Sequence, residues 1–187
     1  MKTEEKSLTK ETLFFDTDCI SAFLWIDDTS IVAKLYNGRI AIPTQVYTEL
    51  SSCSGRASIL KERIDTMVHN GQALIIDMDI DSKEYVVFYE LALDPPKGEL
   101  MIGKGEAACI ALAKERGGIL ASNNFRDTKK YIEKYGLKYT TTADIILEAY
   151  NKKLLSHDEA ENMWQEMLKK RRRLGALSFK DYLSKHK

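Results

Sequence analysis

Short apolar runs alternate with longer amphipathic segments along most of this chain, and this alternation constrains its fold more than any other feature. The runs cover residues 13–15, 39–42, 73–76, 119–121 and 137–140. Continuous apolar runs of this length are typical of strands that are buried on both faces. Because helical segments separate them, the sequence predicts an α/β fold in three layers, α/β/α, with a central and mainly parallel sheet.

The helical segments are predicted from the spacing of their apolar residues and from the residues that end them. Gly71, Pro95 and Gly117 each follow such a segment and favour a helix end. The last three segments come after the last predicted strand, so we expect extra C-terminal helices. The helical ranges are Thr17 onward, 30–36, 43–51, 56–70, 82–93, 103–116, 125–135, 143–151, 156–173 and 178–184.

Length and composition indicate one domain with a full core, since the chain has 187 residues and 44% are hydrophobic. We expect residues 12–150 to form the main body and residues 151–187 a helical extension packed on it. No apolar run approaches the ~20 residues of a membrane span, and the charged N-terminus lacks the apolar segment of a signal peptide. Cys19, Cys53 and Cys109 form no C-x-x-C pair, so we interpret them as reduced packing residues of a cytoplasmic protein.

The net charge is zero, but the charges are distributed unevenly. Residues 150–187 carry 10 basic and 5 acidic side chains, whereas the rest of the chain carries 18 and 23. Much of the basic excess is the run Lys169–Arg173. Such a run can be a solvated helix end, where cations complement the helix dipole, or a patch that attracts phosphate groups.

Three acidic residues lie where a buried core would not favour them. Asp16 follows the first apolar run, and parallel sheets bind ligands at this carboxyl end of their strands. Glu49 is on a helix with the apolar Val46, and Glu106 is on an apolar stripe with Ile110. If these carboxylates converge, they stay ionised only when a cation compensates them. Oxygen ligands without nearby His or Cys suit Mg²⁺ or Mn²⁺.

Each of these acids also has a structural interpretation. Asp16 could cap the helix that follows it. Glu106 could interact favourably with the dipole at the start of its helix. Glu49 could be an ordinary residue on an exposed helix face.

The segment 122–127 spans a predicted strand end and the start of a helix. Within it, Asn124 offers a neutral carbonyl oxygen and Asp127 follows three residues later on the same helix face. Alternatively, Ser122 or Asn123 caps the helix, and both interpretations can hold together.

The order of these segments resembles the PIN domain, a family of small Mg²⁺- or Mn²⁺-dependent nucleases. Each motif is short, but their order, spacing and placement at strand ends make the match specific. The resemblance covers about residues 12–150, and residues 151–187 would be an extension. It is carried by the segments Phe14–Asp18, Ile42–Leu50, Gly105–Ala113 and Ile119–Asp127.

This resemblance implies that Asp16, Glu49 and Glu106 belong to an acidic cluster that holds the metal. Thr17 matches the small polar residue that follows the first acid in the family. Asp18 stands where Asn is common, and it could orient Asp16 or add charge.

The fourth acid of the family usually falls at Asn123 or Asn124, and here it is missing. Many members have a Thr-x-Asn-x-x-Asp pattern, which Ser122-x-Asn124-x-x-Asp127 resembles. The resemblance therefore leaves open whether one or two ions bind. It implies the catalytic residues Asp16, Glu49, Glu106 and Asp127, with Asn124 as a further metal ligand.

By the same resemblance, the reaction is metal-assisted hydrolysis of a phosphodiester in RNA. An acidic pocket repels a polyanion, so we expect basic and polar groups nearby to bind the substrate. Tyr135, Tyr139 and Trp164 could stack on bases or pack in the core. The expected substrate-binding residues are Thr17, Ser122, Arg126, Lys129, Lys130, Arg171 and Arg172.

The resemblance also suggests partners. Many compact members of the family are the toxin of a toxin–antitoxin pair and are often dimeric. An antitoxin protein and a second copy of this chain are therefore candidate partners, in addition to RNA.

Two other functions remain open at this point. A haloacid-dehalogenase-like phosphatase would use Asp16, at the start of an Asp-x-Asp pattern, as a nucleophile, but it would leave Glu49 and Glu106 without a role. A non-catalytic module of the PIN fold would bind RNA or protein through a weakened metal site, which Asn123 and Asn124 would explain.

Overall fold

The computed structural model describes residues 11–52 and 54–186 and confirms the α/β prediction. Within these residues a five-stranded sheet has the order β3-β2-β1-β4-β5. All neighbouring strands are parallel, and Leu13 of the central strand pairs with Ile40 on one side and Ile119 on the other. The strands are β1 (Leu13–Phe15), β2 (Ile40–Pro43), β3 (Leu74–Ile76), β4 (Ile119–Ala121) and β5 (Lys138–Thr140).

The helices follow the predicted segments closely. A short 3₁₀ turn, η1 (Gly55–Ser58), precedes one of them. The helices are α1 (Thr17–Trp25), α2 (Ser30–Leu35), α3 (Thr44–Ser51), α4 (Ile59–His69), α5 (Lys83–Ala92), α6 (Lys104–Arg116), α7 (Phe125–Tyr135), α8 (Thr142–Asn151), α9 (His157–Lys169) and α10 (Phe179–Lys185).

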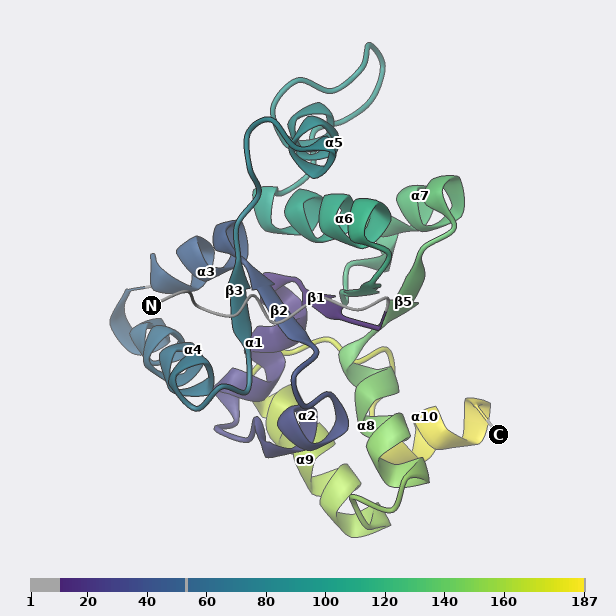
Figure 1. Cartoon of the computed structure of the whole chain (residues 1–187). Helices are drawn as coiled ribbons and strands as arrows, with labels where there is room; N and C mark the ends of the chain where they lie inside the picture. The colour runs from purple at the N-terminus through teal and green to yellow at the C-terminus, as the bar shows by residue number, and fades with distance from the viewer. Residues whose placement is uncertain (1–10, 53, 187) are drawn as a thin grey trace.

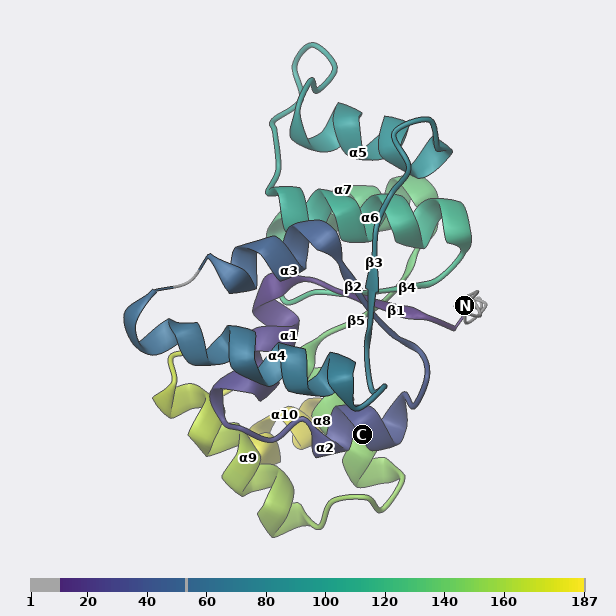
Figure 2. The ribbon, with the colours of Figure 1, turned by 60° about the vertical axis from the view of Figure 1, so that its left-hand side comes forward.

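The helices cover both faces of the sheet, as Figure 1 shows. On one face α6 packs across β1, β2 and β4, and α5 covers the outer side of α6. On the other face lie α1 and α8, with α9 packed on both and α10 on α9. The turned view in Figure 2 shows the same layers. In this view α3 lies beside α4, and it also packs against α6 and α1. The C-terminal helices therefore pack against the body that precedes them.

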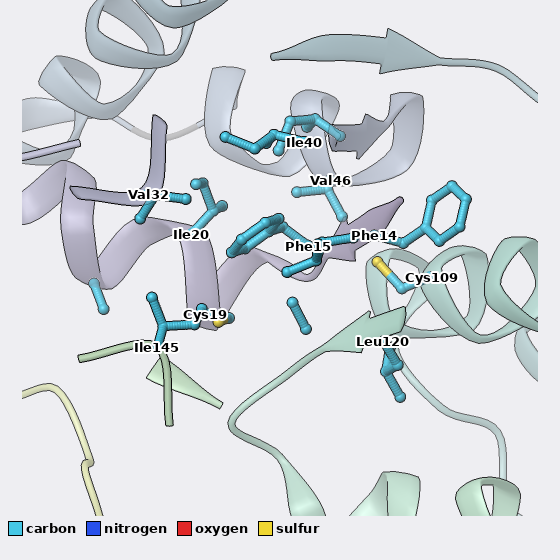
Figure 3. Packing of buried hydrophobic residues seen from close by; sticks show 14 of the residues in the cluster. Phe14, Phe15, Cys19, Ile20, Val32, Ile40, Val46, Cys109, Leu120 and Ile145 are labelled. Atoms are coloured by element: carbon cyan, nitrogen blue, oxygen red, sulfur yellow. The ribbon is translucent and has the colours of Figure 1, made fainter. Parts of the chain in front are cut away.

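The core lies on both sides of the central strand. Phe14 points toward the side of Cys109 on α6, and Phe15 points toward Ile20 on α1 (Figure 3). All four side chains are fully buried. Period-two alternation along a strand places successive side chains on opposite faces, so three residues of β1 are enough to join the two halves of the core.

Gly118 lies where the chain approaches β1 closely. A Cβ atom at this position would lie 2.4 Å from Cε2 of Phe14 and 2.5 Å from the carbonyl oxygen of Thr12. Only glycine fits such a backbone approach.

Two of the three cysteines match their interpretation as packing residues, because Cys19 and Cys109 are free and buried. Cys53 lies outside the described residues. No helix within residues 11–52 and 54–186 combines the length and apolar character needed to cross a membrane.

The two edge strands, β3 and β5, are less buried than the sequence predicts, and in β5 Lys138 and Tyr139 are exposed. The run 73–76 was expected to form a buried strand, but β3 is at the edge of the sheet and Ile75 is exposed. An edge strand has a neighbour on one side only, so apolar residues in it keep contact with solvent.

The predicted helix 156–173 is shorter in the structure, where α9 ends at Lys169. Arg171 adopts a left-handed backbone with φ 59°. Its amide donates to the carbonyl of Leu168 at 2.8 Å, and the amide of Arg172 donates to that of Met167 at 3.0 Å. This pair of bonds is a Schellman motif, which usually ends a helix at glycine. The sequence offers no glycine here, so the helix end was missed.

Candidate metal and nuclease site

Two of the predicted site segments, Asp16–Thr17 and Ser122–Asp127, follow the carboxyl ends of β1 and β4, and Glu49 and Glu106 reach the same place from α3 and α6. The amide of Asp16 donates to the carbonyl of Ala121 at 2.9 Å, so the residue after β1 lies beside the end of β4. From these points the chain continues into α1 on one face of the sheet and α7 on the other. Such a switch point is where parallel sheets form ligand sites.

Asp16 both caps a helix and lies in the site. Its Oδ1 accepts a hydrogen bond from the amide of Cys19 at 2.7 Å, as an N-cap does. The side chain is buried, and this burial raises the pKa of Asp16 to about 7, against hydrogen bonds from Ser122 and Cys19. The charges of Asp18 and Glu49 raise it further. Capping alone would keep the carboxylate ionised, whereas burial beside other acids favours its protonated form.

Glu106 in the first turn of α6 has no complete set of partners. Its Oε1 is buried and has no hydrogen-bond partner among residues 11–52 and 54–186. Burial raises the pKa of Glu106 to about 8, the charges of Asp16, Asp127 and Glu49 raise it further, and the Asn124 side chain lowers it. An unsatisfied buried oxygen costs about 1–3 kcal/mol. The dipole at the helix start therefore does not account for this residue by itself.

Glu49 on α3 is held against the start of α6. Its Oε1 accepts from the amide of Gly105 at 2.9 Å, and its Oε2 accepts from the Thr17 hydroxyl. A Cβ on Gly105 would lie 2.8 Å from that Oε2. Glu49 is thus more than an ordinary surface residue, because it joins α3 to α6 and α1. It lies close enough to Asp16 and Glu106 to raise the pKa of both.

Asn124 and Asp127 form a pair at the start of α7. The Nδ2 of Asn124 donates to Oδ2 of Asp127 at 2.8 Å, and the amide of Asn124 donates to the Ser122 hydroxyl at 3.1 Å. Asp127 is exposed, but its charge reaches Glu106. Ser122 therefore participates in the local turn, as the capping interpretation predicts, and Asn124 still faces the acids.

Asn123, the neighbouring amide, has a different role. Its Oδ1 accepts from the amide of Thr142 at 2.9 Å, and its Nδ2 donates to the Thr142 hydroxyl at 2.9 Å. The same Nδ2 lies 3.4 Å from Oδ2 of Asp18. Asn123 therefore connects the end of β4 to the start of α8 and to Asp18, two residues after Asp16.

Arg172 reaches the site from the C-terminal extension. Its Nη1 lies 3.2 Å from Oδ1 of Asp18 and 3.5 Å from the Ser21 hydroxyl. The sequence indicated Arg172 only as part of a basic run and gave no signal for its contact with Asp18. The short α9 and the left-handed Arg171 direct Arg172 toward this contact.

The predicted substrate-binding cations on α7 make no contact with the acidic cluster among those found for the described residues. Lys130 pairs with Glu99 at 3.2 Å, and Lys129 lies 3.8 Å from Glu133. Arg126, in the first turn of α7, is exposed. Of the aromatic candidates, Trp164 is buried and its indole donates to the carbonyl of Ala176, which confirms its alternative as a core residue.

The donor set suits a hard divalent cation. Within residues 11–52 and 54–186, no three His, Cys, Asp or Glu side chains are already arranged to hold an ion. The chemistry of the site nevertheless fits one, because Asp16 and Glu106 lack a compensating charge and Glu106 has an unsatisfied buried oxygen. Carboxylate and amide oxygens are the ligands that Mg²⁺ and Mn²⁺ prefer.

Comparison with known proteins shows the family to which the chain belongs. A family profile described as "DUF3368: PIN domain" matches residues 12–187. The chain belongs to the PIN domain family. This membership confirms the resemblance and favours it over the phosphatase alternative, in which Glu49 and Glu106 would have no role.

A solved structure supports the same fold. The protein is similar to a chain in the "Crystal structure of DNA bound VapBC from Salmonella typhimurium", with 15% sequence identity and a TM-score of 0.50. The match covers 71% of this PIN protein and 98% of that chain. No curated protein matches the sequence.

Proposed function

We propose that this PIN protein is a metal-dependent endoribonuclease that hydrolyses RNA phosphodiester bonds. The observation that supports this most directly is the buried, unpartnered oxygen of Glu106 beside Asp16 at the switch point of the sheet. A protein gains nothing in stability from two adjoining carboxylates with raised pKa values. A cation would satisfy both.

In this proposal Asp16, Glu106, Asn124 and Asp127 hold Mg²⁺ or Mn²⁺. Glu49 adds charge to the same cluster and fixes the distance between α3 and α6. When bound, the ion would lower the pKa of a water molecule and neutralise charge on the phosphate oxygens. These residues would hold the ion from the start of α1, α6 and α7, which no one segment could do alone.

Substrate binding needs positive charge near this acidic cluster. Arg172 supplies it, because its guanidinium lies at Asp18, two residues after Asp16. Arg126 at the start of α7 and Arg171 add further positive charge, and Thr17 and Ser122 offer hydroxyl groups. We therefore expect the RNA strand to approach across the N-terminal ends of α1 and α7.

Cleavage of labelled single-stranded RNA tests this function. We expect cleavage with Mn²⁺, none with EDTA, and a loss of at least about 100-fold in Asp16→Asn and Glu106→Gln, since each removes charge from the reacting centre. Glu115→Gln is the matched control, because Glu115 is on the same helix but pairs with Lys114. Cleavage that survives EDTA and both site substitutions would exclude the proposal. RNA binding without any cleavage by the wild type would favour the non-catalytic binding module.

We also propose an antitoxin as protein partner and the outer face of α5 as its docking surface. On this face Val86, Tyr89 and Leu93 are exposed at helical spacing, and Leu100 and Met101 are exposed in the loop that follows. Figure 1 shows α5 as the outermost element above α6. A helix that is apolar on both its inner and outer faces is typical of a covered helix.

The charges around this face indicate the chemistry of the partner. Residues 77–104 contain seven acidic side chains and three lysines. Two of the acids are already paired, Glu84 with Arg116 and Glu99 with Lys130. The remaining excess of negative charge suits an antitoxin segment with apolar residues flanked by Lys or Arg.

A neighbouring small open reading frame would supply the protein for the test. We expect its product to inhibit cleavage and Val86→Glu to weaken this complex at least about 10-fold, since it buries a charge in an apolar contact. Leu154→Glu is the control, because Leu154 is also an exposed apolar residue but follows α8 instead of lying on α5. If both variants bind the partner as tightly as the wild type does, the partner binds another surface.

Because Cys19 and Cys109 are free thiols, we also propose that the protein is in the cytoplasm.

A further inference from the structure

A small hollow lies beside the site, between the end of β5 and the C-terminal extension. Its volume is about 220 Å³. This is below the range of about 300–1,000 Å³ that drug-sized ligands occupy, and it suits one planar ring. The lining includes Asn123, Tyr139, Arg173, Tyr182 and His186.

Three aromatic side chains line part of this hollow. Tyr139, in the middle of β5, is 40% exposed, and its ring packs against Phe125 with centroids 5.5 Å apart. In the same lining, the rings of Tyr182 and His186 stack with centroids 4.0 Å apart and an interplanar angle of 24°. Tyr182 also packs on Trp164, so the exposed rings of Tyr139 and His186 are the ones that a nucleobase can stack on.

Tyr182 is held in place by a hydrogen bond to Asp144. The phenol of Tyr182 donates to Oδ1 of Asp144 at 2.6 Å, and Oδ2 of Asp144 accepts from the amide and hydroxyl of Thr141. The ring of Tyr182 is therefore fixed through Asp144 to the start of α8.

Asn123 connects the hollow to the metal site. It lines the hollow, and its Nδ2 also lies 3.4 Å from Oδ2 of Asp18. The turn after α9 contributes to both places, because Arg172 pairs with Asp18 and Arg173 lines the hollow. The acidic cluster and the hollow are therefore adjacent parts of one surface, with Arg172 at the cluster and Arg173 at the hollow.

We propose that this hollow binds one base of a single-stranded RNA, next to the phosphodiester bond at Asp16 and Glu106. The proposal rests on the nuclease function proposed above and defines its substrate further. Bases in a duplex are stacked on each other and cannot enter a lateral hollow, whereas unpaired bases can be turned out and stacked on aromatic rings. Arg173 beside the rings binds the phosphate that follows the base.

Binding of a labelled 12-nucleotide RNA in EDTA tests this proposal without any cleavage. Fluorescence anisotropy is measured for a set of RNAs in which a single abasic nucleotide is moved along the strand. We expect one position at which the missing base weakens binding to the wild type by about 5- to 100-fold, as a stacked base does. In Tyr139→Ala the RNA with all bases should bind as weakly as that abasic RNA, and the abasic position should have no further effect.

Leu154→Ala is the matched control, since Leu154 is also 40% exposed and follows the C-terminal end of α8, whereas Tyr139 precedes its N-terminal end. Arg173→Ala should weaken binding of intact and abasic RNA by the same factor, because a phosphate contact does not depend on the base. If the abasic nucleotide weakens binding to Tyr139→Ala and to the wild type by the same factor, the proposal is overturned. If the coupling is present but the wild type cleaves no RNA with Mn²⁺, the base site stands and the nuclease function fails.

Discussion

Glu49 and Gly105 come from helices far apart in the chain, yet the amide of Gly105 donates to Oε1 of Glu49 at 2.9 Å. A Cβ on Gly105 would lie 2.8 Å from the other carboxylate oxygen. The contact therefore holds α3 against the start of α6 and places an acid beside Glu106. It depends on the absence of a side chain at residue 105.

Gly105→Ala should displace Glu49 and so disturb the acidic cluster. We expect Mn²⁺-dependent cleavage to fall at least about 10-fold, because small shifts of a positioning group are costly in catalysis. Gly103→Ala is the control, since a Cβ there meets nothing within 4 Å and the loss of glycine at this N-cap costs the helix about 0.5–1 kcal/mol without touching Glu49. Kinetics of the two variants under identical conditions check this, and equal rates would remove the positioning role of Glu49.

Stability of the metal-free protein should fall as pH rises from 5 to 9. The folded-state pKa values of Asp16 and Glu106 are about 7 and 8, above their ordinary values of 3.8 and 4.5. The folded chain therefore binds protons more tightly than the unfolded chain, and this stabilisation is lost as pH passes through the folded-state values. For Asp16 the loss is at most about 4 kcal/mol. Denaturation in EDTA across this range checks the sign.

Mn²⁺ should remove this pH dependence. The ligands must be deprotonated to bind a cation, so the rise in Tm on adding Mn²⁺ should be larger at pH 8 than at pH 5.5. A rise that is independent of pH would indicate that the ion binds elsewhere.

Glu106→Gln should separate stability from metal binding. Without metal it should be more stable than the wild type at pH 8.5, because it removes a buried carboxylate with no partner for Oε1. With Mn²⁺ it should show little or no rise in Tm. Differential scanning calorimetry with and without the ion tests both expectations, and a wild-type response of the variant to Mn²⁺ would exclude Glu106 as a ligand.

Arg171→Gly should leave stability unchanged or raise it by up to about 1 kcal/mol. Arg171 has φ 59°, a conformation that costs a residue with a side chain about 1–2 kcal/mol and costs glycine nothing. Glycine loses more backbone entropy on folding, and this loss offsets part of the gain in stability. The turn and the Arg172–Asp18 contact should persist. Chemical denaturation measures the stability, and RNA binding by the same variant shows whether the Arg171 charge contributes.

Much of the fold could be predicted because its information is local. The apolar run 13–15 and the glycine at 117 act within a few residues of the chain, and the structure has a strand and a helix end there. The helix end at Lys169 was missed because Arg171 occupies the position that glycine usually signals. The exposure of Ile75 depends on the order of the strands, which no local pattern contains.

The sequence by itself determined which segments are strands and helices and placed Asp16, Glu106 and Asn124 at element ends, because backbone preference and burial are properties of short segments. Only the tertiary structure decided which groups meet. Glu49 and Gly105 are 56 residues apart, and Asp18 and Arg172 are 154 residues apart. Contacts of this kind follow from how whole helices pack on the sheet, since packing brings together side chains whose separation along the chain carries no signal.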